Sequence, residues 1–275
     1  MKRPIFLGVN AEPNRFMVII LFMIPFLLSV GVYHIWSSNE LKKNPSNKLS
    51  PSISKIVKTT KGLFSEKDEI RDEYQLLEDT VASLKRIGGG LGLAMLGGLT
   101  IGIIMGVFPG MNALLFPFVT FCSIVPPLAI LPILLIMFGA DEMGKIVLIF
   151  IGTFFVITLS IRTAVRDIPR QQLVKAFTLG ASTYQWIFRI VLPQVIPRLI
   201  EATIISLGPA WIFLISSEII LSSHGLGYRI FLMRRGRAMD VIIPYVLWMT
   251  ILGFLMFWIL KKIMQWKYSW YLESK

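Results

Sequence analysis

The distribution of apolar residues is the feature that most limits what this chain can fold into. Apolar residues make up 55% of the 275 residues. They are concentrated in six blocks, each near the roughly 20 residues that a helix needs to cross the hydrocarbon core of a bilayer. The blocks are Phe16–Trp36, Ile87–Phe108, Leu114–Phe138, Met143–Ile161, Leu199–Leu221 and Val241–Leu260. The pattern predicts an all-α membrane protein with about six transmembrane helices. The first block is long for the core of a signal peptide, so we expect a retained helix.

Composition argues against several classes of function. The single cysteine, Cys122, lies within the third block, and His34 and His224 are far apart in sequence, so no disulfide, metal site or cofactor is expected. The net charge of +12 comes from basic residues spread over the loops, which favours anionic lipid headgroups over nucleic acid. Gly139–Ile146 has the spacing of a phosphate loop, but Ile146 replaces the hydroxyl residue that binds magnesium. The chain is therefore not expected to be an enzyme or to bind ATP itself.

Ser37–Arg86 is a long polar segment between the first two blocks. Its first part, Ser37–Thr60, is rich in Lys, Ser, Asn and Pro and is predicted to be irregular. The second part repeats apolar residues at helical spacing, which predicts an amphipathic helix with Ser65–Asp68 capping its start. The apolar positions are Ile70, Tyr74, Leu77, Val81 and Leu84. We expect this helix to lie on the bundle or on the membrane interface, with a docking site for a partner as the alternative.

Glycines in the second block predict close helix packing. Gly98, Gly102 and Gly106 recur every four residues and therefore share one helix face. Small residues on one face let two helix backbones approach closely within lipid.

Prolines in the third block predict a kinked or broken helix, because each proline removes an amide donor. Pro117, Pro126, Pro127 and Pro132 lie in this block. Broken helices are tolerated in membranes where they line a cavity or are buried by neighbours. The block is therefore a candidate for lining a pathway, and structural kinking is an equal alternative.

The loop at 162–198 is short and strongly basic, with six basic residues and one acid, Asp167. Short loops of this kind usually face the cytoplasm. Gln171–Phe177 and Tyr184–Val191 are predicted to form two short helices, separated at Gly180 and stopped by Pro193. The pair would make a compact knob, and a plain basic loop at the membrane interface is the alternative.

The order of residues in this loop resembles the cytoplasmic loop of permease subunits of binding-protein-dependent ABC importers. In that family a Glu-Ala-Ala run is followed by Gly and, further on, by Ile/Val-Leu-Pro. Thr178–Ser182 and Val191–Pro193 match the pattern, whereas Val174-Lys175-Ala176 shares only the last alanine with the Glu-Ala-Ala run. The resemblance implies that this loop couples the chain to a separate ATPase subunit. The implied coupling residues are Lys175, Ala176, Gly180, Ala181, Ser182, Leu192 and Pro193.

The resemblance covers nearly the whole chain after about residue 80. Ile124–Pro132 is similar to the proline-rich third helix of the nitrate/sulfonate/taurine group, and Gly208–Trp211 and Gly225–Tyr228 to its fifth helix and following loop. It implies an ABC importer type I permease-like bundle. The implied pathway candidates are Pro126, Pro127, Pro132, Trp211 and Glu218. For Glu218, an ion pair with an arginine in Arg229–Arg237 is the favoured alternative to a gate.

The predicted organisation has four parts. Residues 1–36 form an N-terminal segment and the first transmembrane helix, and 37–86 form a polar extracytoplasmic segment with the amphipathic helix. Residues 87–265 form a permease core of five transmembrane helices with the coupling loop 162–198, and 266–275 form a C-terminal tail.

The resemblance implies the transmembrane permease subunit of an ABC importer, a multi-pass protein of the cell (inner) membrane that forms the solute pathway. Its implied partners are an ATPase subunit, an extracytoplasmic substrate-binding protein and a second permease subunit, expected to be an identical copy. It also places both termini in the cytoplasm, although the count of Lys and Arg does not by itself support this orientation. An energy-independent channel or secondary transporter is the alternative function, and ionisable groups at mid-membrane would favour it.

Overall fold

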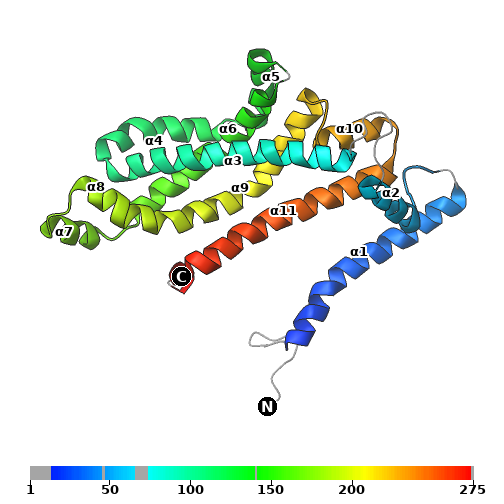
Figure 1. Ribbon diagram of the computed structural model, residues 1–275, viewed down its shortest axis with the longest axis horizontal. Coiled ribbons are helices and arrows are strands. Elements are labelled where there is room, and N and C mark those ends of the chain that lie inside the picture. Colours follow the sequence, from blue (N-terminus) through cyan, green and yellow to red (C-terminus); the bar gives the residue numbers. More distant parts are fainter. Residues whose placement is uncertain (1–13, 45–46, 66–73, 140, 274–275) are drawn as a thin grey trace. The chain divides into compact units, whose positions relative to one another are not determined.

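The computed structural model describes residues 14–44, 47–65, 74–139 and 141–273, and every regular element in them is helical (Figure 1). The helices are α1 (Arg15–Lys43), α2 (Ile53–Ser65), α3 (Gln75–Val107), α4 (Pro109–Ile124), α5 (Pro127–Phe138), α6 (Glu142–Arg166), α7 (Arg170–Thr178), α8 (Thr183–Trp186), α9 (Leu192–Leu221), α10 (Leu226–Arg235), α11 (Met239–Lys267) and α12 (Ser269–Glu273). A π-helical turn, Ile187–Val191, joins α8 to α9. The chain divides into two compact units, 1–62 with 233–244, and 63–232 with 245–275.

Five helices in the described residues are long and apolar enough to cross a membrane: α1, α3, α6, the run Thr183–Ile220 that contains α9, and α11. The pair α4 and α5 gives a sixth candidate if it counts as one span, although it is bent by 93°. The bend falls at Val125 and Pro126, directly before Pro127 opens α5. The predicted all-α membrane fold is confirmed, and so is the break predicted from the prolines.

The first unit contains α1 and most of α2. The Ser37 hydroxyl donates to the carbonyl oxygens of Ser50 and Pro51, both at 3.0 Å. The prediction that Ser37–Thr60 is irregular is wrong, because α2 begins at Ile53, where the Ser52 hydroxyl accepts from the Lys55 amide at 3.3 Å. A serine hydroxyl at this position satisfies a free amide of the first helical turn.

The predicted surface helix is instead the beginning of α3. Ser65 ends α2 and so does not cap this helix, while Ile70 and residues 66–68 lie outside the described residues. Leu77 and Val81, from the apolar stripe, are 50% and 48% exposed, while the opposite face of the helix is buried. That buried face carries Asp79, Thr80, Ser83 and Arg86. In a membrane protein the apolar face of a helix meets lipid and its polar face turns inward. The predicted amphipathic helix is therefore present, but its polar face packs against the bundle and its apolar face is exposed.

In the second unit α3 packs lengthwise against α6, with its glycines as the contact. A Cβ added at Gly98 would lie 2.7 Å from Ile157 Cγ2, and one at Gly102 would lie 2.7 Å from Ile161 Cβ. At Gly106 the distance to Val165 Cβ would be 2.5 Å. These positions advance together along both helices, so the two run in the same direction. The predicted close approach along the glycine stripe is confirmed.

The second unit has two ends with different contents. At one end lie α7 and α8, with the turn between α3 and α4 (Figure 1). The C-terminal helix α12 is at this end too, because the Tyr271 hydroxyl donates to Glu201 Oε2 near the start of α9 at 2.8 Å. At the other end the starts of α3 and α6 meet the end of α9 and the turn into α10 (Figure 1).

Candidate functional site

The two-helix knob, residues 170–191, lies where the basic loop was predicted to fold. The Ser182 hydroxyl accepts from the Gln185 amide at 3.3 Å, and the Gln185 side chain accepts from the Ser182 amide at 2.9 Å, which caps α8. Gly180 lies between α7 and α8 with a φ of +80°, a conformation that favours glycine. The two predicted helices and the break at Gly180 are confirmed.

The prediction that Pro193 stops the second helix of the knob is wrong. The chain passes through the π-helical turn Ile187–Val191 directly into α9. Proline lacks an amide, and its ring clashes with the carbonyl of the preceding turn. The turn before Pro193 is a π-helical turn, which is wider than an α-helical turn and occurs as a single-turn bulge within helices. The knob is therefore continuous with a membrane-spanning helix.

The knob has a buried base and an exposed apolar surface. Ala176 and Trp186 are buried against the helices beneath, whereas Leu179, Tyr184 and Val174 are 87%, 68% and 55% exposed. The other predicted coupling residues differ in exposure. The exposed ones are Lys175, Gly180, Ser182 and Pro193, and the half-buried ones are Ala181 and Leu192.

The exposed charges of the knob are all basic. Arg170, Lys175 and Arg189 are exposed, and no acid occurs between Asp167 and Glu201 in the sequence. An exposed surface that is both apolar and cationic is suited to contact with another molecule.

The opposite end of the unit holds a charge cluster, which we define as Asp79, Arg86, Glu142, Lys145, Glu218 and Arg229. Within it, Glu218 is fully buried. Its Oε1 accepts from Arg86 Nη1 at 2.7 Å and from the Ser83 hydroxyl at 2.6 Å, and its Oε2 accepts from the Gly227 amide at 2.7 Å. The favoured prediction of an ion pair is correct in kind, but the partner is Arg86 on α3 and not an arginine in Arg229–Arg237.

Asp79 forms a second buried ion pair in the cluster. Its Oδ2 accepts from Arg229 Nε at 2.9 Å and from the Tyr245 hydroxyl at 3.1 Å, and its Oδ1 accepts from the Gly225 amide at 2.7 Å. Burial lowers the pKa of Arg229, but the hydrogen bond and charge of Asp79 outweigh it and raise that pKa overall. Asp79 therefore stabilises the charged form of the Arg229 guanidinium.

The turn Gly225–Gly227 is bound to the cluster through its backbone. Its three successive amides donate to Asp79, Ser83 and Glu218 at 2.7 to 3.0 Å. Gly225 has a φ of +125°, and a Cβ there would lie 2.6 Å from Glu218 Oε1. Only glycine allows the backbone to approach these side chains so closely.

Glu142 is bound at the outer edge of the cluster. Arg86 Nε and Nη2 donate to its two oxygens at 2.5 and 2.7 Å, and Lys145 Nζ donates to Oε1 at 2.8 Å. The Arg86 and Lys145 side chains are 1% and 3% exposed, whereas that of Glu142 is 53% exposed. The segment that resembles a phosphate loop in spacing thus supplies two of the six cluster residues, Glu142 and Lys145.

No role was predicted from the sequence for Asp79, Arg86, Glu142 or Lys145, four of the six cluster residues. Asp79 lies in α3, on the part of that helix that precedes the predicted span Ile87–Phe108. A usable signal was present: Asp79, Ser83 and Arg86 follow one another at steps of four and three, which places them on one helix face.

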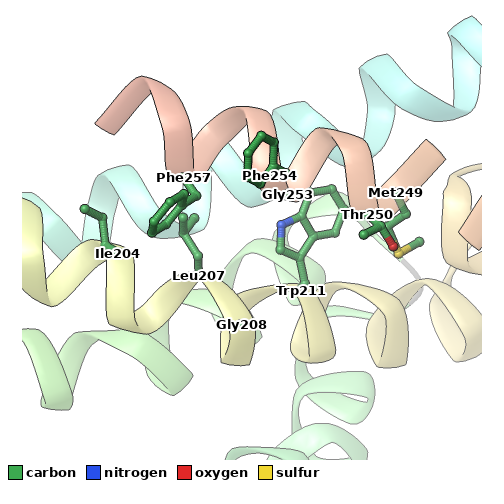
Figure 2. A pocket seen from close by; sticks show the side chains of 9 residues that line it. All are labelled: Ile204, Leu207, Gly208, Trp211, Met249, Thr250, Gly253, Phe254 and Phe257. Atoms are coloured by element: carbon green, nitrogen blue, oxygen red, sulfur yellow. The ribbon is translucent and has the colours of Figure 1, made fainter. Parts of the chain in front are cut away.

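The five pathway candidates are not brought together. Trp211 lines a cavity of about 470 Å³ between α9 and α11, shown with its apolar lining in Figure 2. Its indole Nε1 is buried with no hydrogen-bond partner among the described residues, and Gly253 lies against it. Pro126, Pro127 and Pro132 lie in α5 or at its start and do not line this cavity, and Glu218 lies in the charge cluster.

Comparison with known proteins identifies the family of this chain. The sequence model described as "Binding-protein-dependent transport system inner membrane component" matches residues 98–270, more than half of the chain. The chain is 33% identical to the taurine transport system permease protein TauC of Escherichia coli (strain K12) over 66% of each chain. It is 30% identical to the bicarbonate transport system permease protein CmpB of Synechococcus elongatus, over 72% of this chain and 70% of the relative. The match to TauC thus leaves about a third of that relative's length unaligned.

Solved structures share the fold. A chain of the MetNI methionine ABC transporter in an inward-facing conformation superposes with a TM-score of 0.63 at 18% identity, covering 72% of this chain and 98% of that one. The fold of this chain therefore has a counterpart of known structure in an ABC transporter.

Proposed function

The chain belongs to the family of binding-protein-dependent transport system inner-membrane components, and from this premise we propose that it is the membrane-spanning permease subunit of an ABC importer. It forms the solute pathway and performs no bond chemistry of its own. The observation that supports this most strongly is the knob, an exposed apolar and basic surface built directly onto a membrane-spanning helix.

A separate ATPase subunit docks on the knob from the cytoplasm. Leu179, Tyr184 and Val174 would enter an apolar groove of that subunit, and Lys175 would meet acidic groups at the groove's rim. Because the π-helical turn joins the knob to α9 without a break, movement of the knob moves the helix that carries Trp211. ATP-driven closure of the ATPase dimer would then tilt the helices between inward-open and outward-open states.

The remaining partners follow from the same role. A substrate-binding protein delivers the solute to the outer face, and two identical copies of the chain surround one pathway. Pro126, Pro127, Pro132 and Trp211 are the residues we place along that pathway, while Glu218 holds the charge cluster. Both termini and the loop 162–198 lie in the cytoplasm, the core extends from the start of α3 at Gln75 to residue 265, and the polar segment that precedes α3 lies outside.

The solute carries an oxyanion group. Taurine is a sulfonate and bicarbonate an oxyanion, and relatives named for these solutes are 33% and 30% identical to this chain over the aligned residues. We therefore assign the cargo to small sulfonates, carboxylates or bicarbonate.

Reconstitution of the permease with its ATPase in liposomes tests the proposal. Solute and binding protein should stimulate ATP hydrolysis in the wild type. Gly180→Val places a β-branched residue at a φ of +80° and should abolish the stimulation while the protein still inserts. Solute flux without any ATPase subunit would favour the channel or secondary transporter instead.

A further inference from the structure

Two buried cations converge on one exposed carboxylate at the start of α6. Arg86 and Lys145 are 1% and 3% exposed, and both bind Glu142, whose side chain is 53% exposed. Arg86 uses two nitrogens, one for each oxygen of Glu142. Buried cations are normally matched by anions buried with them, whereas here the anion is the member that reaches solvent.

The other charges of the cluster are already matched. Glu218 pairs with Arg86 through Nη1, and Asp79 pairs with Arg229. With Glu142 withdrawn, Arg86 Nε and Nη2 and Lys145 Nζ would share one excess positive charge beside a solvent-exposed position. His224 Nε2, 3.2 Å from Arg86 Nη2, adds a further polar atom.

We propose that Arg86 and Lys145 form a binding site for an oxyanion group, and that Glu142 occupies this site in the present conformation as an internal substitute. The Glu142 carboxylate stands for the sulfonate, carboxylate or bicarbonate oxygens of a solute. A guanidinium fork that presents two parallel donors selects such groups. The solute as the source of the oxyanion rests on the proposed function, and an anionic lipid headgroup offers the same chemistry.

The site predicts that an added oxyanion replaces the carboxylate of Glu142 when that side chain is removed. The purified chain carrying Glu142→Ala is heated in detergent with sodium methanesulfonate or with sodium chloride at equal ionic strength. Methanesulfonate at about ten times its Kd should raise the Tm by about 3 °C over chloride. The wild type and Glu142→Gln should show no difference between the salts, because a side chain fills the site in both.

The chain offers a matched control on its surface. Glu40 pairs with Lys43 three residues later, as Glu142 does with Lys145, but Lys43 is 73% exposed. Glu40→Ala should therefore give no methanesulfonate response. Adding Lys145→Met to Glu142→Ala should remove most of the response, because one of the two cations is lost.

A cysteine variant keeps the test valid if the alanine variant does not fold. Glu142→Cys in a Cys122→Ala background is labelled with an anionic sulfonatoethyl or a cationic trimethylammonioethyl methanethiosulfonate. The anionic label should raise the Tm and the cationic label should not, since only the former restores an oxyanion to the fork.

Two outcomes would overturn the proposal in different ways. Equal salt responses in Glu142→Ala, Glu40→Ala and the wild type, or equal effects of the two labels, would mean that Glu142 is only a structural ion pair. A Tm rise with phosphatidylglycerol micelles but not with methanesulfonate would assign the site to a lipid headgroup and contradict the solute assignment. Neither readout requires ATP-coupled transport, so failure of the proposed function would be seen separately.

Discussion

The charge cluster and the knob lie at opposite ends of the second unit. The cluster buries charged side chains, whereas the knob exposes apolar ones. In the cluster, Arg86, Glu218 and Asp79 are buried and each is paired with another group of the same chain. In the knob, Leu179 and Tyr184 remain exposed, so their apolar surface is covered by nothing in the described chain. In this conformation the cluster end is therefore closed by groups of the same chain, whereas the knob end presents the apolar surface on which we propose that the ATPase subunit docks.

Two glycines with positive φ, Gly180 in the knob and Gly225 at the charge cluster, show the same contrast in the backbone. At Gly225 a Cβ would meet the cluster at 2.6 Å, whereas at Gly180 no atom lies within 4 Å of the added Cβ. The first glycine is required by packing and by conformation, and the second by conformation alone.

The largest expected effect comes from removing the central cation of the cluster. Arg86→Met leaves Glu218 buried without its ion-pair partner and should lower the free energy of unfolding by about 3–5 kcal/mol. Size-exclusion chromatography and thermal unfolding in detergent would measure this loss. Arg189→Met, at an exposed arginine of the knob, should change stability by less than about 0.5 kcal/mol but weaken ATPase association.

A double substitution sharpens the same point. Arg86→Met with Glu218→Gln removes both buried charges and should recover part of the lost stability. Full stability in the single Arg86→Met variant would show that the cluster does not hold the helices together.

A smaller effect is expected from adding one methyl group to each of the two glycines. Gly225→Ala should cost about 2–3 kcal/mol, because strain at a φ of +125° adds to the overlap with Glu218. Gly180→Ala should cost about 1 kcal/mol, from conformation alone. Thermal unfolding of the two variants side by side measures the difference, and equal costs would contradict the packing argument for Gly225.

The smallest effect is expected at Tyr271, whose hydroxyl donates to Glu201 at the knob end of the unit. Burial, and then its hydrogen bond to Glu201, raise the pKa of Tyr271 to about 12. Because the folded state favours the protonated phenol, this contribution to stability is complete below the unfolded pKa of about 10 and is lost as pH rises from 10 to 12.

Tyr271→Phe should cost about 1 kcal/mol at neutral pH, because one hydrogen bond is lost. It should also flatten the stability curve between pH 10 and 12, as measured by chemical unfolding in detergent. An unchanged slope in that range would remove Tyr271 from the account of alkaline stability.

Local signals in the sequence predicted much of the fold. Apolar length predicted the spans, four-residue glycine spacing predicted the α3–α6 contact, and Pro126 and Pro127 predicted the broken pair. Gly180 predicted the break within the knob. Each of these features depends on neighbours within one or two helical turns, and for that reason a single sequence reveals it.

The charge cluster could not be predicted as a unit, because its partners are far apart in sequence. Arg86 binds Glu142 and Glu218, on two other helices, and nothing local to any of the three identifies the others. The first turns of α3 were predicted as a separate surface helix for the same reason, because only the partner Arg229 shows that Asp79 is buried. The helix end predicted at Pro193 was wrong because the π-helical turn before Pro193 accommodates the proline, and the sequence alone does not reveal that turn.

Hydrogen–deuterium exchange of the permease, alone and with its ATPase subunit in nanodiscs without nucleotide, tests most directly the claim that one end is closed by the chain itself and that the other binds the ATPase. Amides of the knob, residues 170–191, should become protected when the ATPase binds, while those at 79–86 and 218–229 should exchange slowly and equally in both samples. Unchanged exchange in the knob, or new protection confined to the charge cluster, would contradict the account.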